Sequence, residues 1–166
     1  MVSVYFYLKK IGIDPIFKQT RIGRFGQKFT ILKFRTMPVG TIEAPTHLVP
    51  SEHLPSFCVW LRKQKIDELP QFFNVLKGEM SVVGYRPCLA IQADLCQLRE
   101  SKRIFDYLPG ITGYAQCQGL TMRDHDRLVE TEHSMYEGWS VKRYMSVIGM
   151  TVVYLFKIAF DRYSAS

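Results

Sequence analysis

The chain has 166 residues, of which 47% are hydrophobic and 22% are charged, so it is long enough to bury the core of one domain. This composition excludes a disordered or a collagen-like chain. The 22 lysines and arginines exceed the 15 acidic residues and give a formal net charge of +7. The excess favours a polyanionic partner, such as nucleic acid, a phosphorylated ligand or an anionic membrane surface, without choosing among them.

The first part of the chain is predicted to contain a β-hairpin and a loop. The N-terminal stretch MVSVYFYL is apolar and ends at Lys9 and Lys10. Residues 16–22 and 28–34 are rich in apolar residues and flank GRFGQ, whose glycines suit a turn, so they are predicted to pair as a short hairpin. Residues 38–50 are rich in proline and threonine without periodicity and are predicted to form a mobile loop.

Two helices are predicted in the middle of the chain. The first starts at Ser51, a capping residue, and runs to about Lys63. The second starts at the acidic pair Asp67–Glu68 and ends at Gly78. In it, Asp67 can act as the N-cap and Glu68 can interact with the helix dipole. The apolar positions expected to face the core are Leu69, Phe72, Phe73 and Leu76.

The second half is predicted to be mainly helical. Residues 89–107 have the pattern of an amphipathic helix, and 109–119, PGITGYAQCQG, that of a glycine-rich loop or short strand. Residues 124–138 form a polar helical pattern. The apolar segment 144–160 is predicted to be a buried C-terminal helix, and a helix lying in a membrane interface is the alternative. No apolar run is long enough for an ordinary membrane-spanning helix.

The cysteines indicate packing rather than catalysis. They form no CxxC pair and no zinc-ligand pattern, and no signal peptide is recognisable before them. We therefore expect reduced thiols that act as small packing residues. The four positions are Cys58, Cys88, Cys96 and Cys117.

Several side chains suit phosphate chemistry. Phosphate oxygens prefer guanidinium and ammonium groups, and a transferred phosphoryl group also needs a divalent cation held by carboxylates. Asp67 is expected to be ionised at neutral pH, and a carboxylate can attack phosphorus to form an acyl phosphate. Taken singly, a lysine or arginine of a basic protein is usually a solvated surface charge, and an acidic pair at a helix start is usually a cap. The basic candidates are Lys33, Arg35, Arg62 and Arg86.

Three long segments occur in order along the chain: FKQTRIGRFGQKFTILKFRTM, LRKQKIDELPQFFNVLKGEMSVVGYRP and LPGITGYAQCQG. They resemble the bacterial sugar transferases, monotopic polyprenol-phosphate phosphoglycosyltransferases that initiate exopolysaccharide, O-antigen lipopolysaccharide and protein-glycan assembly. Because three long motifs occur together, over roughly residues 15–155, the resemblance is highly specific. With the predicted elements it implies one α+β domain over 1–166, mainly helical, with a short β-hairpin or small sheet and amphipathic helices at a membrane interface.

The resemblance implies an enzyme that transfers a phosphosugar from a UDP-sugar to undecaprenyl phosphate and releases UMP. It implies that Asp67 attacks the sugar-bearing β-phosphate and forms an aspartyl phosphosugar, from which the lipid phosphate takes the sugar phosphate in a second, ping-pong step. Glu68 is implied to hold Mg²⁺ together with Asp67, or to assist proton transfer. The implied location is the cytoplasmic face of the bacterial inner membrane, against anionic lipid.

The resemblance also assigns binding residues. Lys33, Arg62 and Arg86 are implied to contact phosphate or nucleotide, and Pro87 to shape the turn that presents Arg86. Arg35 is a further candidate for substrate binding, with a structural role as the alternative, because an arginine beside a strand end often supports the backbone. No motif in the sequence encodes which sugar is transferred.

The chain departs from the family pattern at four places. One is the stretch before Arg62, where SEHLPSFCVW replaces a segment that is often rich in glycine and arginine. Members usually begin with a longer, re-entrant apolar helix, and residues 1–12 are expected to be the remnant of it, which favours self-association through exposed apolar surface. Tyr85 stands where the family usually has proline, a change expected to alter how the nucleotide base is held. Tyr144 stands where an aspartate is usual.

Other functions were weighed against this one. A catalytically idle interaction module of the same family stays open. A nucleic-acid-binding domain is disfavoured, because 69–76 is expected to be a packing face rather than a polar recognition helix. A transition-metal site in RDHDRLVETEH, formed by Asp124, His125, Asp126 and His133, is disfavoured because adjacent residues face different sides of a helix.

Overall fold

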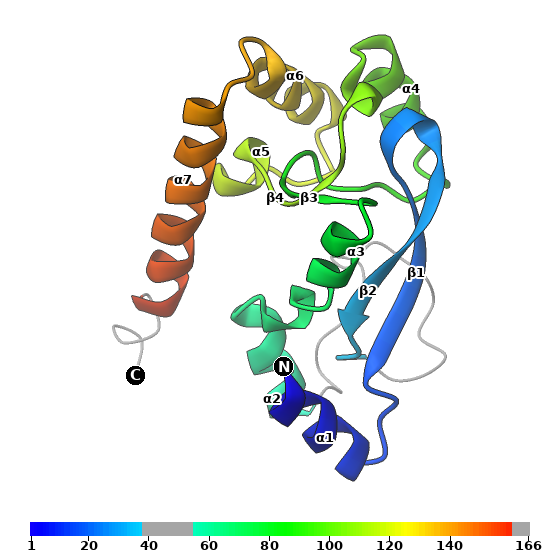
Figure 1. The fold of residues 1–166 in the computed structure, drawn as a ribbon, viewed down its shortest axis with the longest axis vertical. Helices are drawn as coiled ribbons and strands as arrows, with labels where there is room; N and C mark the ends of the chain where they lie inside the picture. The colour runs from blue at the N-terminus through cyan, green and yellow to red at the C-terminus, as the bar shows by residue number, and fades with distance from the viewer. Residues whose placement is uncertain (38–54, 161–166) are drawn as a thin grey trace. The chain divides into compact units, whose positions relative to one another are not determined.

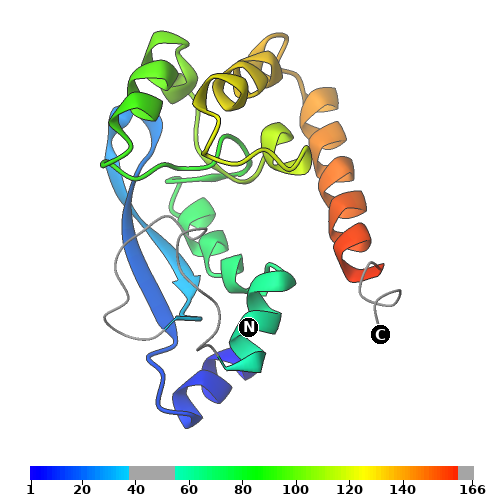
Figure 2. The ribbon, with the colours of Figure 1, turned by 180° about the vertical axis from the view of Figure 1, so that it is seen from behind.

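The computed structural model describes residues 1–37 and 55–160, and the predicted loop 38–50 lies outside them. The fold class is confirmed: helices predominate, and the described strands form two small two-stranded sheets (Figures 1 and 2). The single domain remains a prediction. By internal contacts the chain divides into two compact units: Met1–Lys18 with Leu32–Pro70 form the first unit, and Gln19–Ile31 with Gln71–Ser166 form the second.

The hairpin has the predicted bounds. Strands β1 (Ile16–Ile22) and β2 (Lys28–Phe34) pair with each other and are joined through the short turn η1 (Arg24–Gly26). At the open end, Arg35 N–H donates a hydrogen bond to Pro15 O over 2.8 Å. The prediction succeeded because local turn chemistry specifies a hairpin with little help from the rest of the fold.

The first unit contains α1 (Val2–Lys10), α2 (Ser56–Lys63) and the 3₁₀ turn η3 (Ile66–Glu68). The predicted start of the first helix at Ser51 lies outside the described residues; within them, α2 begins after Pro55, which has extended backbone angles. Proline is tolerated at a helix start because it has no N–H to donate. The buried residues of the small core are Leu8, Phe34 and Cys58.

The second unit is built on a parallel strand pair, β3 (Ser81–Val83) with β4 (Gly110–Thr112). A β-carbon on Gly84 would lie 2.5 Å from Leu108 O, and one on Gly110 would overlap the backbone of Gly84. Gly84 and Gly110 therefore allow the backbone around β3 and the backbone around β4 to approach closely. The short strand predicted within 109–119 is confirmed, and it is followed by the helical turn α5 (Tyr114–Cys117).

Helices α4 and α6 pack together in the second unit. The single helix predicted over 89–107 is shorter: α4 (Ala93–Ser101) is followed by η4 (Ile104–Asp106), because Arg103 between them is left-handed at φ 55°. The helix predicted over 124–138 is confirmed as α6 (His125–Tyr136).

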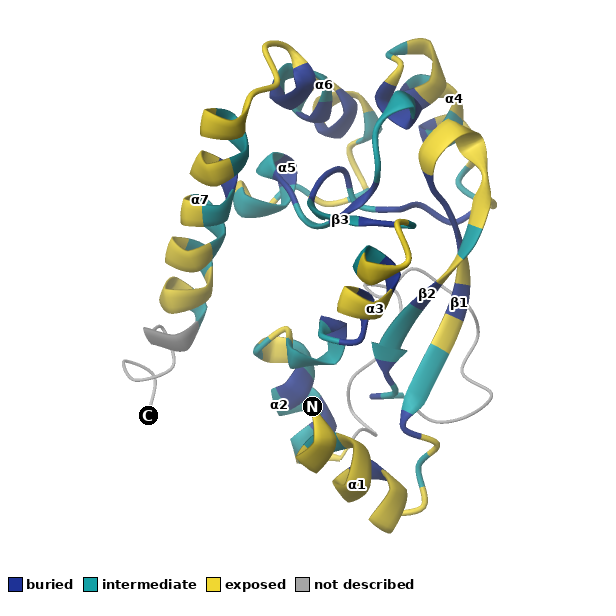
Figure 3. Cartoon of the chain, viewed as in Figure 1, coloured by how far each residue is buried: buried dark blue, intermediate teal, exposed yellow. Residues whose placement is uncertain are grey.

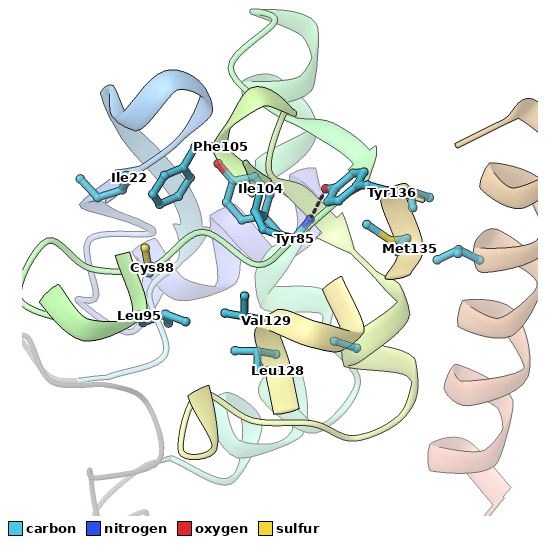
Figure 4. Packing of buried hydrophobic residues seen from close by; sticks show 13 residues of the cluster. Ile22, Tyr85, Cys88, Leu95, Ile104, Phe105, Leu128, Val129, Met135 and Tyr136 are labelled. Atoms are coloured by element: carbon cyan, nitrogen blue, oxygen red, sulfur yellow. Dashed lines mark hydrogen bonds between the residues drawn. The ribbon is translucent and has the colours of Figure 1, made fainter. Parts of the chain in front are cut away.

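Aromatic residues organise the core of the second unit. Tyr85 N–H donates a hydrogen bond to Tyr136 Oη at 3.0 Å, as Figure 4 shows. The Tyr136 ring stacks on Tyr107 with centroids 3.9 Å apart, and the Tyr85 ring meets Phe105 edge-on at 5.6 Å. Other buried members are Ile22, Val83, Cys88, Leu95, Ile104, Ala115, Leu128, Val129, Met135 and Val147.

Helix α3 (Gln71–Leu76) presents the opposite face from the one predicted. Phe72, Phe73 and Leu76 are 45%, 51% and 82% exposed, so the expected packing face is wrong at these three positions. The fourth, Leu69, is partly buried and packs against the core of the first unit. The argument that this face packs in the core therefore does not bear on nucleic-acid binding. The exposed side chains are nevertheless apolar, unlike those of a recognition helix.

The buried side of α3 is polar. Gln71 and Asn74 are buried, and Asn74 Nδ2 donates hydrogen bonds to Thr30 O and Glu79 Oε2, both at 2.7 Å. These bonds fix the side of α3 that faces the β2 backbone. The end of the helix follows the prediction, because Gly78 has a left-handed φ of 74°.

Helix α7 (Val141–Phe160) runs beside α5, and the prediction that it is buried is wrong. In its residues 141–158 only Val147 is buried. Figure 3 shows exposed positions along the outer side of the helix. Within residues 1–37 and 55–160, no helix is long and apolar enough to cross a membrane. The exposed apolar residues of α7 are Val141, Met145, Val152, Val153, Leu155 and Phe156.

Candidate functional site

The acidic pair Asp67–Glu68 lies on the η3 turn between α2 and α3. Lys65 starts this turn in a left-handed conformation, φ 58°, and its carbonyl accepts a hydrogen bond from Glu68 N–H at 3.2 Å. Because α3 starts only at Gln71, the N-cap role predicted for Asp67 is wrong. A non-glycine residue in this region is uncommon and strained, and such strain often occurs at functional sites.

A lysine from the hairpin reaches the acidic pair. Lys33 Nζ on β2 lies 3.1 Å from Glu68 Oε1, although the two residues are 35 positions apart in the sequence. Both side chains are largely buried, with 13% and 10% exposed. Partial burial strengthens the attraction compared with a surface pair. The fold thus brings together Lys33, Asp67 and Glu68, three of the residues predicted for the site.

The surroundings of the Asp67 carboxyl group disfavour its ionised form. Burial, followed by repulsion from the Glu68 charge, raises its pKa from 3.8 to about 6. The positive charges of Lys33, Lys65 and Arg62 oppose this rise in pKa. Arg62, predicted to bind phosphate, thus interacts electrostatically with the Asp67 carboxyl group. Asp67 Oδ1 is buried and has no hydrogen-bond partner among the described residues.

An unpartnered buried carboxylate oxygen indicates a position for a ligand. Leaving such an acceptor unsatisfied costs about 1–3 kcal/mol, and a cation or an electrophilic phosphorus would remove that penalty. The pair also fits Mg²⁺, which prefers oxygen ligands and commonly takes one or two carboxylates plus substrate phosphates. In the described part of the chain no third histidine, cysteine or acidic residue joins the pair.

The Arg35 guanidinium contacts residues of the chain before β1 and on it. Its Nη2 lies 3.0 Å from Asp14 Oδ2, and its Nε donates to Asp14 O at 3.0 Å. The guanidinium also lies over the Phe17 ring at 5.7 Å. These contacts support the structural alternative for Arg35, and its role in substrate binding stays a prediction.

Arg86 and Pro87 belong to the second unit, where the backbone around them is held at several points. Arg86 N–H donates to the Glu132 carboxylate, and Pro87 O accepts from Arg21 Nη1 at 3.2 Å. Glu132 in turn accepts two hydrogen bonds from Arg99, at 2.9 and 2.7 Å, and both side chains are buried. A bidentate pair of this kind fixes geometry as well as charge.

The sequence analysis did not identify Glu132 as a residue that supports the backbone at Arg86. Residues 124–138 were expected to be a solvated polar helix, yet Glu132 lies on the buried face. Its spacing from Leu128, Val129 and Met135 places it in one helical stripe, so periodicity could have identified it. Tyr85, expected to influence the nucleotide base, is instead 1% exposed and packs in the core. In the segment where a transition-metal site was disfavoured, Asp124 caps α6 by accepting from Arg127 N–H at 3.1 Å.

These features define a class of protein: an α+β chain with a largely buried acidic pair near lysine and arginine side chains, in which one carboxylate oxygen has no hydrogen-bond partner among the described residues. This chemistry suits a phosphorylated substrate. The chain belongs to the bacterial sugar transferase family, because the family model of that description matches residues 1–158. Membership confirms the resemblance and places the chain among transferase enzymes.

Three relatives illustrate the relationship. The sugar transferase EpsL of Bacillus subtilis is 38% identical over 86% of this chain and 70% of its own length. The UDP-glucose:undecaprenyl-phosphate glucose-1-phosphate transferase of Escherichia coli is 35% identical over 82% of this chain. The galactosyl transferase CpsE of Streptococcus agalactiae is 32% identical over 87%. The matched part is only 32% and 35% of the lengths of the last two proteins.

Proposed function

We propose that this chain transfers a sugar phosphate from a UDP-sugar to undecaprenyl phosphate and releases UMP, as the first membrane step of polysaccharide or glycoconjugate assembly. The observation that carries the proposal is the Asp67 carboxylate, whose Oδ1 is buried without a hydrogen-bond partner among the described residues and on which three cations act. The substrates are those in the name of the Escherichia coli relative, a UDP-sugar and undecaprenyl phosphate.

The Asp67 carboxylate acts as the nucleophile. Its oxygen forms a bond to the β-phosphorus of the donor while the bond from that phosphorus to the UMP oxygen breaks, which leaves an aspartyl phosphosugar. A phosphate oxygen of the lipid then attacks the same phosphorus, and the carboxylate is released. Burial suits this role, because a poorly solvated carboxylate gives up little hydration on attack.

The remaining residues bind and neutralise charge. Lys33 and Arg62 balance the negative charge that gathers around Asp67, and Arg86, on the turn shaped by Pro87, binds donor phosphate or nucleotide. Glu68 holds Lys33 in place. Asp67 and Glu68 would hold Mg²⁺, which when bound supplies charge neutralisation for the diphosphate.

The acceptor places the reaction at a bilayer, and we assign the cytoplasmic face of the inner membrane, where UDP-sugars are available. The outer side of α7 supports docking on anionic lipid. Its apolar residues are exposed, and Lys142, Arg143 and Lys157 provide positive charge with no acidic residue between Val141 and Phe160. An amphipathic helix with this distribution binds in the interface plane.

The experiment is UMP release from UDP-sugars in the presence of Mg²⁺, with and without undecaprenyl phosphate. A covalent intermediate predicts one UMP per enzyme without the lipid, and continuous release with it. Asp67→Asn is expected to abolish both phases, because an amide is a poor nucleophile. The matched control is Asp14→Asn, which removes an exposed carboxylate from the first unit and is expected to keep both.

Two results would contradict the mechanism. UMP release from Asp67→Asn at the wild-type rate would exclude Asp67 as nucleophile. Release that requires lipid even in the first turnover would indicate direct transfer instead of a ping-pong scheme. A wild-type chain that binds vesicles yet releases no UMP from any UDP-sugar would support the idle interaction module.

A further inference from the structure

Two of the cysteines lie side by side in the second unit. Cys88 Sγ is 3.4 Å from Cys96 Sγ, and both are thiols. Sulfur atoms in a disulfide are about 2 Å apart, so closure requires an approach of roughly 1.4 Å. The other cysteines have different surroundings: Cys58 is in the core of the first unit, and Cys117 Sγ lies 3.4 Å from Thr151 Oγ1.

The backbone, rather than the side chains alone, holds the two thiols together. Cys88 O accepts a hydrogen bond from Ile22 N–H at 3.0 Å, which fixes the segment after Pro87. The chain then reverses at Leu89, whose N–H donates to Gln92 Oε1 at 2.9 Å and whose carbonyl accepts from Gln92 N–H at 3.0 Å. Cys96 follows on α4, one turn after Gln92.

We propose that Cys88 and Cys96 are a site of reversible oxidation, at which a small peroxide converts the two thiols to a disulfide. The site is distinct from the acidic pair and uses no residue of it. Oxidation joins the segment that carries Arg86 and Pro87 covalently to α4.

The disulfide is expected to affect the position of Arg86. This consequence rests on the proposed function, in which Arg86 binds the donor. Cys88 is two residues after Arg86, while Cys96 lies about one turn before Arg99 on α4. Arg99 pairs with Glu132, and Glu132 accepts the Arg86 N–H. Closing the sulfur–sulfur gap pulls on both ends of this network, so the turn is displaced and weaker donor binding is expected.

The chemistry balances with a peroxide as oxidant. Cys88 is fully buried and Cys96 is partly exposed, so the peroxide meets Cys96 first. The Cys96 sulfur takes one peroxide oxygen and becomes a sulfenic acid, and the rest leaves as water from hydrogen peroxide. The Cys88 sulfur then bonds to Cys96 sulfur and expels a second water, so two thiols supply the two electrons.

The reaction is expected to be slow. Burial, and next the neighbouring Cys88 thiol, raise the pKa of the Cys96 thiol, so little thiolate is present at neutral pH. Since the thiolate is the reactive form, oxidation is expected over minutes to hours rather than seconds. Thiol–disulfide exchange with a dithiol reductant reverses it.

Mass spectrometry of the full chain tests the disulfide. After hydrogen peroxide treatment and alkylation, trypsin releases residues 78–99 as one peptide with both cysteines, since Arg86–Pro87 resists cleavage. We expect this peptide two hydrogens lighter and free of alkyl groups, restored to two alkylated thiols by dithiothreitol. The matched control Cys117→Ser is expected to behave as wild type. Full alkylation of both thiols after peroxide, or pairing of either with another cysteine, would overturn the proposal.

Donor kinetics test the consequence separately. Oxidised wild type is expected to show a several-fold higher KM for the UDP-sugar, reversed by dithiothreitol, whereas peroxide-treated Cys96→Ser keeps the KM of its reduced form. An unchanged KM in fully oxidised protein would refute the effect on Arg86. If no sample releases UMP, the proposed function fails, while the peptide mass still decides the disulfide.

Discussion

At the scale of single residues, the Asp67 carboxyl group links the candidate site to folding stability. Its pKa is raised from 3.8 to about 6, so the folded chain holds this proton more tightly than the unfolded chain. The resulting stabilisation is fully present below about pH 4 and is lost as the pH rises through 6. Above that pH, the ionised carboxylate destabilises the fold.

Asp67→Asn is therefore expected to stabilise the protein at pH 8 and to change little at pH 4. Removing the buried charge gains on the order of 3 kcal/mol at most, from a shift of about two pKa units. Urea denaturation at both pH values, with a chelator to remove divalent cations, measures the difference. Asp14→Asn, at an exposed carboxylate, should show no such gain, and a loss of stability for Asp67→Asn at pH 8 would contradict the prediction.

The same protonation should govern the first chemical step. In the proposed mechanism only the ionised Asp67 carboxylate attacks phosphorus, so single-turnover UMP release is expected to fall about tenfold per pH unit below pH 6 and to level off above it. Rapid-quench measurements between pH 5 and 8 give the profile. A rate that stays level down to pH 5 would indicate that Asp67 keeps an ordinary pKa during the reaction.

At the scale of secondary-structure elements, the Arg99–Glu132 ion pair ties α4 to α6. Both side chains are buried, so each charge depends on the other. Arg99→Met leaves Glu132 without its partner and is expected to lower the free energy of unfolding by about 3–5 kcal/mol, measured by urea denaturation. The double variant Arg99→Met/Glu132→Leu removes both charges and should recover most of the loss.

An exposed ion pair between Lys102, the residue after α4, and Glu130 on α6 is the matched control. Lys102 Nζ lies 2.7 Å from Glu130 Oε1, with side chains 40% and 62% exposed. Lys102→Met is expected to change stability by less than about 1 kcal/mol. If Arg99→Met and Lys102→Met had equal effects, burial of the Arg99 pair would not be what stabilises this contact.

The secondary-structure elements also show which parts of the fold and of the site can be predicted from the sequence. The hairpin and the end of α3 at Gly78 follow from local turn chemistry, and the motifs located Asp67. The contact between Lys33 and Glu68 joins β2 to η3 across 35 residues, which no local pattern specifies. In α3 and α7 the periodicity identified an apolar face correctly but did not show whether protein covers it.

At the scale of the whole molecule, helix α7 carries apolar residues on both sides. On its inner side Val147 is buried in the core of the second unit and Ile148 packs against that core. Two polar contacts add to this packing: Tyr144 Oη lies 3.3 Å from Ser81 Oγ, and Thr151 Oγ1 lies 2.9 Å from Thr112 Oγ1. Other large apolar residues of α7 are exposed on its outer side. In water this arrangement is unfavourable, so a bilayer surface, as proposed for the acceptor step, accounts for it.

Vesicle co-sedimentation of the full chain tests this docking. Val153→Ser/Phe156→Ser is expected to weaken binding to anionic vesicles at least tenfold, since burying each large apolar side chain contributes about 1.5–3 kcal/mol. Ile91→Ser, at an equally exposed apolar residue outside α7, is the matched control and should bind as wild type. Because Lys142 and Lys157 are exposed, high salt should weaken binding without abolishing it. Wild-type binding by the α7 variant would show that another surface meets the lipid.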